Sequence, residues 1–345
     1  MEILEAVKKF HWMNVGEDGV VEMFLDHHSL STFRMCEAAF ELSLMANIKT
    51  KTRNWNLEFG ILYHKMIEEF YIAKRDNCFA IDKWLGSAIK MWTELRMDEF
   101  DEHLVYKKLN GLDGFATLLI QYAEHFASEV DRLRVIGIEI TFGKKKEVPL
   151  GEFKIVDDDY ILGINTPVRC YLTGRIDFLM DSGTSIGPLD HKTTAFFGKD
   201  NIVNSYDPQE GMTGYIFSTR EILKRNFPDL LGARKVDRIW MNFASITPPP
   251  DGDPLKRFKR IPIFKQDWQL EQYRLRQLRT FHKIYDLVIG DERPDWNTSM
   301  CNNMFHKPCQ YQNLHKQGTN QDMIQILNTD FRVAAPWNPE DIRDE

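Results

Sequence analysis

Two aspartates and a lysine in the middle of the chain have residue types and a spacing that could do chemistry. Asp190 and Lys192 lie two residues apart in SIGPLDHKTT (185–194), and Asp177 lies in YLTGRIDFLM (171–180). Both segments have the apolar, β-branched composition of strands, and the turn-forming residues between them predict a hairpin. Alternate side chains of a strand share a face, so Asp190 and Lys192 point the same way and pairing would bring Asp177 beside them.

Two carboxylates beside an ammonium suit a hard divalent cation such as Mg²⁺, which prefers oxygen ligands. Such a cation lowers the pKa of an attacking water and stabilises charge on a phosphate. The lysine would hold the nucleophile or a phosphate oxygen, so the set favours phosphodiester hydrolysis. The alternative is an ordinary pair of solvated charges on an exposed strand. The apolar residues beside Asp177 argue that the group is partly buried.

The elements that must position these residues follow from the hydrophobic periodicity. Up to about residue 135 apolar residues recur at helical steps. Ser31 is the predicted N-cap of the first helix, whose apolar stripe includes Cys36. Further helices are expected at about residues 57–74, 82–97 and 112–133.

The pattern then changes to strands at 135–142, in the hairpin, at 236–246 and at 256–264, with helices at about 209–225 and 266–289. The sequence therefore predicts an α/β protein with three parts. These are a helical portion (1–134) that carries the His64 helix, a core (135–290) and a C-terminal segment (291–345) that ends, beyond about residue 330, in a loose tail.

Composition narrows the class of protein. The 345 residues carry 44 Lys+Arg against 51 Asp+Glu, a net charge of -7 that excludes a basic nucleic-acid coat. No stretch reaches the ~18 apolar residues of a membrane helix, and the acidic N-terminus does not resemble a signal peptide. A cytoplasmic protein is expected, in which the 5 cysteines are thiols or metal ligands and not a disulfide framework.

Five stretches together resemble the PD-(D/E)XK nuclease superfamily, specifically its RecB-like exonuclease branch with phage-encoded and CRISPR-associated relatives. They span residues 30–311 in the family's order: LSTFRMCEAAFEL, EFGILYHKMIEEF, VIGIEITF, LTGRIDFLM with GPLDHKTT, and CNNMFHKPCQY. The resemblance implies a restriction-endonuclease-like fold, in which helices flank a mixed central sheet and the N-terminal portion is helical. It also implies a metal-dependent DNA exonuclease that uses Mg²⁺ or Mn²⁺, and for a phage-encoded member the host cytoplasm as its location.

The resemblance also assigns roles to individual residues. His64, Asp177 and Asp190 match the metal-binding groups of the family, Lys192 matches the catalytic lysine, and Glu139 matches an acid that assists nearby. Without the family, His64 on an apolar helix would more often be a core histidine.

The helix after the active-site lysine departs from the family pattern, which has Gln, three residues, then Tyr. Tyr215 is present and matches a catalytic position, but residue 211 is glycine and the nearest glutamine is Gln209. Tyr215 could equally be a core residue.

Many RecB-like relatives hold an iron-sulfur cluster with one cysteine near the N-terminus and three near the C-terminus. Cys36, Cys301 and Cys309 resemble three of these ligands, and His315 stands at the fourth. The resemblance therefore implies a structural [4Fe-4S] cluster or a Zn²⁺ ion. Such a site would pin the ends of the chain together, so the C-terminal segment (291–345) is expected to pack back on the N-terminal helices. The alternative is that Cys36 only packs in the core and the C-terminal pair is a relic.

DNA is the expected partner, together with replication or recombination proteins. The candidate phosphate contacts are Lys256, Arg257, Lys259 and Arg260, although such a run is also typical of a solvated surface. A catalytically silent nucleic-acid-binding or assembly protein that keeps the nuclease fold is the alternative function.

Overall fold

The structure is a computed structural model that describes residues 9–130, 134–143, 145–154, 167–194, 206–249, 252–290, 293–297, 309–316 and 320–336. The chain divides into two compact units, each built from separate segments. The first unit contains Met1–Thr52, Thr141–Gly174 and Trp268–Glu345, and the second contains Arg53–Ile140 and Arg175–Asp267. Neither boundary expected from the sequence, after residue 134 or after residue 290, coincides with a boundary between these units.

The second unit combines helices with strands, and its elements lie close to their predicted positions. Its helices are α4 (Trp55–Arg75), α5 (Ile81–Glu94), the 3-10 turn η2 (Met97–Phe100), α6 (Leu104–Leu109), α7 (Gly111–Val130), α9 (Glu210–Asn226), α10 (Pro228–Ala233) and the 3-10 turn η3 (Pro254–Arg257). Its strands are β4 (Arg134–Phe142), β6 (Pro167–Asp181), β7 (Ile186–Thr194), β8 (Arg238–Ser245) and β9 (Phe258–Phe264), of which β4 and β6 continue into the first unit.

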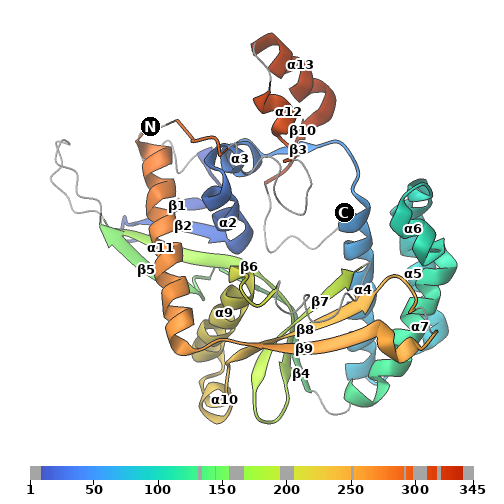
Figure 1. Ribbon diagram of the computed structural model, residues 1–345. Helices are drawn as coiled ribbons and strands as arrows, with labels where there is room; N and C mark the ends of the chain where they lie inside the picture. Colours follow the sequence, from blue (N-terminus) through green and yellow to red (C-terminus); the bar gives the residue numbers. More distant parts are fainter. Residues whose placement is uncertain are drawn as a thin grey trace. The chain divides into compact units, whose positions relative to one another are not determined.

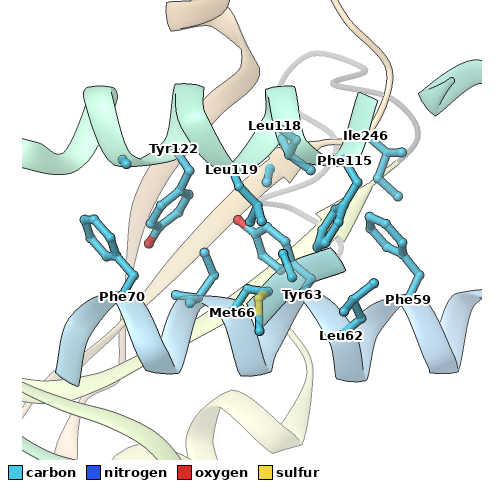
Figure 2. Close-up of a cluster of buried hydrophobic side chains, with 14 of the residues drawn as sticks. Phe59, Leu62, Tyr63, Met66, Phe70, Phe115, Leu118, Leu119, Tyr122 and Ile246 are labelled. Carbon is cyan, nitrogen blue, oxygen red and sulfur yellow. The ribbon is translucent and has the colours of Figure 1, made fainter. Parts of the chain in front are cut away.

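The core of the second unit lies between α4 and α7. Asn54 caps α4 by accepting a hydrogen bond from the Asn56 backbone N–H, and large apolar side chains then recur every three or four residues. Figure 2 shows these side chains meeting those of α7, with Tyr63, Met66 and Phe70 facing Leu119 and Tyr122. This buried cluster of apolar and aromatic side chains fixes α4 against α7.

The strands of this unit form a mixed sheet in the order β6-β7-β8-β9. β6 and β7 are the predicted antiparallel hairpin, with Phe178 opposite Leu189. The turn is closed by the Asp181 carboxylate, which accepts a hydrogen bond of 2.7 Å from the Gly183 N–H, and Gly183 has the positive φ of 85° that favours glycine. β7 pairs with β8 in parallel, and β8 pairs with β9 antiparallel.

Helices cover this sheet on both faces. α4 packs on β7, and α9 packs on β7 and β8 (Figure 1). Leu189 of β7 faces the core formed with α4 and α7, so Asp190 and Lys192 face the other way. The predicted mixed α/β architecture, with helices flanking a sheet, is confirmed.

In the first unit, strands near the N-terminus pair with the first half of β6, which lies parallel to β2 and antiparallel to β5. The remaining elements join segments far apart in sequence. The bounds are β1 (Met13–Val15), β2 (Val21–Asp26), α2 (His27–Met35), α3 (Glu37–Phe40), the π-helix η1 (Glu41–Met45), β3 (Ile48–Thr50), β5 (Pro149–Lys154), α11 (Asp267–Ile289), α12 (Gln312–His315), α13 (Asn320–Asp330) and β10 (Phe331–Val333).

Two local predictions in this unit are wrong. The first helix begins at His27 with Asp26 as its cap, because the Asp26 carboxylate is 2.6 Å from the Ser29 N–H; Ser31 lies inside the helix. That helix ends at Cys36, whose backbone is extended. The chain beyond residue 330 is not all tail, because β10 pairs antiparallel with β3 and buries Phe331.

Within the described residues, no helix is both long enough and apolar enough to cross a membrane.

Candidate active site

The β6-β7 hairpin brings the three residues of the sequence prediction together. The Lys192 ammonium lies 2.9 Å from Asp190 Oδ1 and 2.8 Å from Oδ2. Asp177 interacts electrostatically with both residues across the hairpin. The sequence predicted that Asp190 and Lys192 share one face of their strand and that hairpin pairing brings Asp177 beside them. The structure has this arrangement.

The buried position of this group shifts its pKa values. Asp190 is only 4% exposed, and burial raises the pKa of its carboxyl although the Lys192 ammonium opposes the shift. Burial acts against the charged form of Lys192, but the Asp190 carboxylate outweighs it and raises the pKa of the lysine. Lys192 therefore opposes the effect of burial on the Asp190 carboxyl, and Asp190 favours the charged form of the lysine, whose side chain is 34% exposed.

His64 of α4 joins these residues through both of its ring nitrogens. Its Nδ1 lies 3.1 Å from Asp177 Oδ2, and its Nε2 lies 2.6 Å from the backbone carbonyl of His191. Because a carbonyl can only accept, Nε2 carries a proton and the ring is fixed in orientation. Metal-ligating histidines commonly donate one ring N–H to a backbone carbonyl and bind the ion through the other nitrogen. In His64 the carbonyl contact is present, and the other nitrogen faces the Asp177 carboxylate.

The His64–Asp177 pair is held together by charge. Burial disfavours protonation of His64, yet the Asp177 carboxylate more than compensates and raises the pKa of the imidazole. Burial likewise opposes ionisation of Asp177, and the His64 charge and hydrogen bond overcome it, so the pKa of this carboxyl lies well below its usual range. The His64 ring thus lies beside the Asp177 carboxylate at a position that favours positive charge.

The chemistry of the donor set fits a hard divalent cation. Asp190 Oδ2 is buried and accepts no hydrogen bond of good geometry, and Asp177 lies next to His64 Nδ1. Those two carboxylates, with Nδ1 once it is deprotonated, would hold such an ion. As the side chains stand, however, the described residues contain no group of three His, Cys, Asp or Glu close enough to bind a metal.

Comparison with models of protein families identifies the family of this chain. A family model described as the PD-(D/E)XK nuclease superfamily matches residues 27–216, which include His64, Asp177, Asp190 and Lys192. The chain belongs to the PD-(D/E)XK nuclease superfamily. The mixed sheet with flanking helices is consistent with a restriction-endonuclease-like fold, and the family indicates a phosphodiesterase of the nuclease type. Nucleases of this superfamily generally use Mg²⁺ or Mn²⁺. No curated protein sequence is similar enough to count as a relative.

Glu139 lies in strand β4 of the nuclease, in an unusual backbone conformation. Its φ of 50° is rare for a residue with a side chain, and its carboxylate lies 3.0 Å from Arg175 NH1. Arg175 stands two residues before Asp177 on β6 and is 13% exposed at its side chain. Glu139 is thus paired with a neighbour of the metal-binding candidates, and a direct role at the metal stays a prediction.

Tyr215 and Gln209 lie on and before α9. Tyr215 is half-buried and its carbonyl accepts a hydrogen bond from Thr219, while Gln209 is exposed at the N-terminus of the helix. A catalytic role for Tyr215 stays a prediction.

A buried polar network behind β7 was missed by the sequence analysis. Asn242 Nδ2 lies 3.1 Å from His191 Nδ1 and donates to the Tyr122 hydroxyl at 3.1 Å, which in turn donates to the Tyr71 hydroxyl at 3.2 Å. Burial lowers the pKa of His191 well below its ordinary value, so its ring is neutral and Nδ1 can accept. No local signal marks these residues, because asparagine and tyrosine in apolar segments are common. The network anchors the residue whose carbonyl orients His64.

The basic run after Pro254 does not form a surface patch as expected. Arg257 is 1% exposed, and its guanidinium donates to the carbonyls of Ser245 and Ile246 and to Gln121 Oε1, each at 2.8 Å. The prediction that Arg257 contacts DNA is therefore wrong, because its donors are used inside the protein.

The other three cations of that run differ in exposure. Arg260 is half-buried, donates to the Tyr71 hydroxyl at 3.2 Å and stacks over Phe126. Lys256 and Lys259 are exposed, and contacts with DNA from these two stay predictions.

The predicted second metal site is described only in part. Cys36 and Cys309 belong to one buried cluster with Tyr311 and Phe331, so the C-terminal segment does pack on the N-terminal part of the first unit. Cys301 and the side chain of His315 lie outside the described residues. An iron-sulfur cluster or a zinc ion at this set stays a prediction.

Proposed function

We propose that this chain is a Mg²⁺- or Mn²⁺-dependent deoxyribonuclease of the RecB-like branch that degrades DNA as an exonuclease. One observation carries the proposal. Four groups from three elements, namely His64, Asp177, Asp190 and Lys192, converge within one compact unit and within the range matched by the nuclease family.

The mechanism follows from the charges of these groups. A divalent cation held by Asp177, Asp190 and His64 would lower the pKa of a water and neutralise charge on a phosphate. Lys192 remains protonated beside Asp190, and its side chain is 34% exposed, so its ammonium can reach a substrate oxygen or the attacking water. The Asp190 carboxylate holds that ammonium in place. The His191 carbonyl fixes the His64 ring, which leaves Nδ1 directed at Asp177.

DNA cleavage can be tested directly. Linear single-stranded DNA, linear duplex and closed circular duplex are incubated with the protein and Mg²⁺, with and without EDTA. We expect loss of linear DNA from its ends, survival of the closed circle and complete inhibition by EDTA. Lys192→Ala should be inactive, and Lys90→Ala, which removes an exposed lysine of α5 that has no proposed role at the site, is the matched control for the loss of a positive charge.

The outcomes separate the alternatives. Cutting of the closed circle would replace the exonuclease by an endonuclease. Binding of DNA without any metal-dependent cleavage would favour the silent binding protein, and full activity of Lys192→Ala would remove the proposed mechanism.

A further inference from the structure

Tyr206 lies next to the proposed active site although no motif marks it. Its ring packs on Phe243 of β8, with ring centroids 5.3 Å apart and an angle of 60° between the planes. Phe243 is the direct neighbour of Lys192 in the parallel β7-β8 register. Directly neighbouring residues of two paired strands project on the same face, so the Tyr206 ring lies over the face that carries Asp190 and Lys192.

The backbone around Tyr206 is anchored. The buried Lys265 ammonium, on a side chain that is 6% exposed, donates to the carbonyl of Asp207 at 2.5 Å and lies 3.0 Å from its carboxylate. The Tyr206 carbonyl accepts a hydrogen bond of 3.0 Å from the Gln209 N–H. Tyr206 is therefore held at its place before the docking of any substrate, as a preorganised contact requires.

The Tyr206 hydroxyl is available for a ligand. It interacts electrostatically with the Lys192 ammonium and the Asp190 carboxylate, and within the described part of the chain it forms no hydrogen bond. In contrast, the hydroxyls of Tyr71 and Tyr122 are both used inside the core. Burial raises the pKa of Tyr206, so its phenol keeps its proton at neutral pH and is a donor.

We propose that Tyr206 is a catalytic residue whose hydroxyl donates a hydrogen bond to a non-bridging oxygen of the scissile phosphate, beside the Lys192 ammonium. The proposal rests on the proposed nuclease function and adds a substrate contact to it. Negative charge on the phosphate oxygens is best stabilised by fixed donors in a place with little water, and an ammonium and a phenol on one sheet face provide two.

The test compares the wild type with Tyr206→Phe, which keeps the ring on Phe243 and removes only the hydroxyl. Tyr106→Phe, which removes a hydroxyl bonded to Asp98 at 2.8 Å, is the matched control. Single-turnover cleavage of an end-labelled oligonucleotide should slow by roughly 10- to 100-fold in Tyr206→Phe, the effect of one hydrogen bond made in the transition state. The thermal unfolding temperature and the affinity for DNA in Ca²⁺ should stay unchanged.

A phosphorothioate substrate links the effect to one oxygen. Sulfur is a weak acceptor, so one of the two diastereomers should reduce the difference between the wild type and Tyr206→Phe, while the other should leave it in full. If the wild type cleaves and Tyr206→Phe cleaves within twofold of it, or if both diastereomers keep the full difference, the Tyr206 assignment is overturned and the nuclease function stands. If the wild type does not cleave at all, the function fails and the assignment fails with it.

Discussion

Asp190 and Asp181 are two buried aspartates whose variants can distinguish a loss of catalysis from a loss of folding. Both lie on the β6-β7 hairpin, with 4% and 7% exposure, and each contacts one basic side chain. Only Asp190 belongs to the proposed metal site. Asp181 instead caps the turn and lies 3.2 Å from Arg234 Nε. Replacing each by asparagine keeps the shape and removes one charge.

The magnitudes differ between the two variants. Asp190→Asn removes a proposed metal ligand and the anchor of Lys192, so we expect a loss of about 1000-fold or more in cleavage rate, which corresponds to about 4 kcal/mol of transition-state stabilisation. Its stability should change by no more than about 1 kcal/mol, because the lost ion pair is offset by the relief of burying a carboxylate, and Lys192 can reach solvent. Asp181→Asn should lose about 1 kcal/mol of stability from its ion pair and keep its activity within about twofold.

The assay is single-turnover cleavage in saturating Mg²⁺, combined with urea unfolding followed by tryptophan fluorescence. Retention of more than about a tenth of the wild-type rate by Asp190→Asn would refute the assignment of Asp190. An equal loss of rate in both variants would show that the hairpin acts only through folding.

Three further predictions follow from the structure. Arg257→Ala should lower the free energy of unfolding by about 3–5 kcal/mol, because three acceptors inside the protein lose a charged donor. The control Lys259→Ala, at an exposed position, should change the free energy of unfolding by less than about 0.5 kcal/mol. If urea unfolding gives Arg257→Ala the stability of the wild type, the argument from burial is wrong. Because the pKa of His64 is raised in the fold, its ion pair stabilises the metal-free protein fully below the unfolded pKa of about 6.5, and this contribution is lost as the pH rises through the higher folded value. In EDTA, the stability difference between the wild type and His64→Gln should therefore shrink above that range, and a difference that does not vary with pH would be inconsistent with the pair. Iron or zinc should copurify anaerobically with the wild type and be absent from the double variant Cys36→Ser, Cys309→Ser; elemental analysis and absorption near ~400 nm measure this, and a metal-free wild type would remove the second metal site.

Local geometry made the centre of the candidate site predictable. The side chains of a strand alternate with a fixed period, so the spacing of Asp190 and Lys192 alone put them on one face. The short turn between the two strands then makes them pair as a hairpin, which brings Asp177 close to that face. The long apolar stripe of α4 was readable for the same reason, since a helix repeats every few residues. The ends of helices were less predictable, because several polar residues near the start of a helix can act as its N-cap. The first helix shows this, since Asp26 and not Ser31 caps it.

The sequence by itself therefore determined the α/β elements, the shared face of Asp190 and Lys192, and the position of the helix that carries His64. Tertiary structure alone decided that the His64 ring meets the His191 carbonyl, 127 residues away, and that Tyr206 packs beside Lys192. It also decided that Arg257 lies inside the protein. The physical reason is that the backbone geometry of a single helix or strand fixes which side chains share a face. Which side chains of different elements meet depends instead on how the elements pack and on the need of every buried polar group for a hydrogen-bond partner.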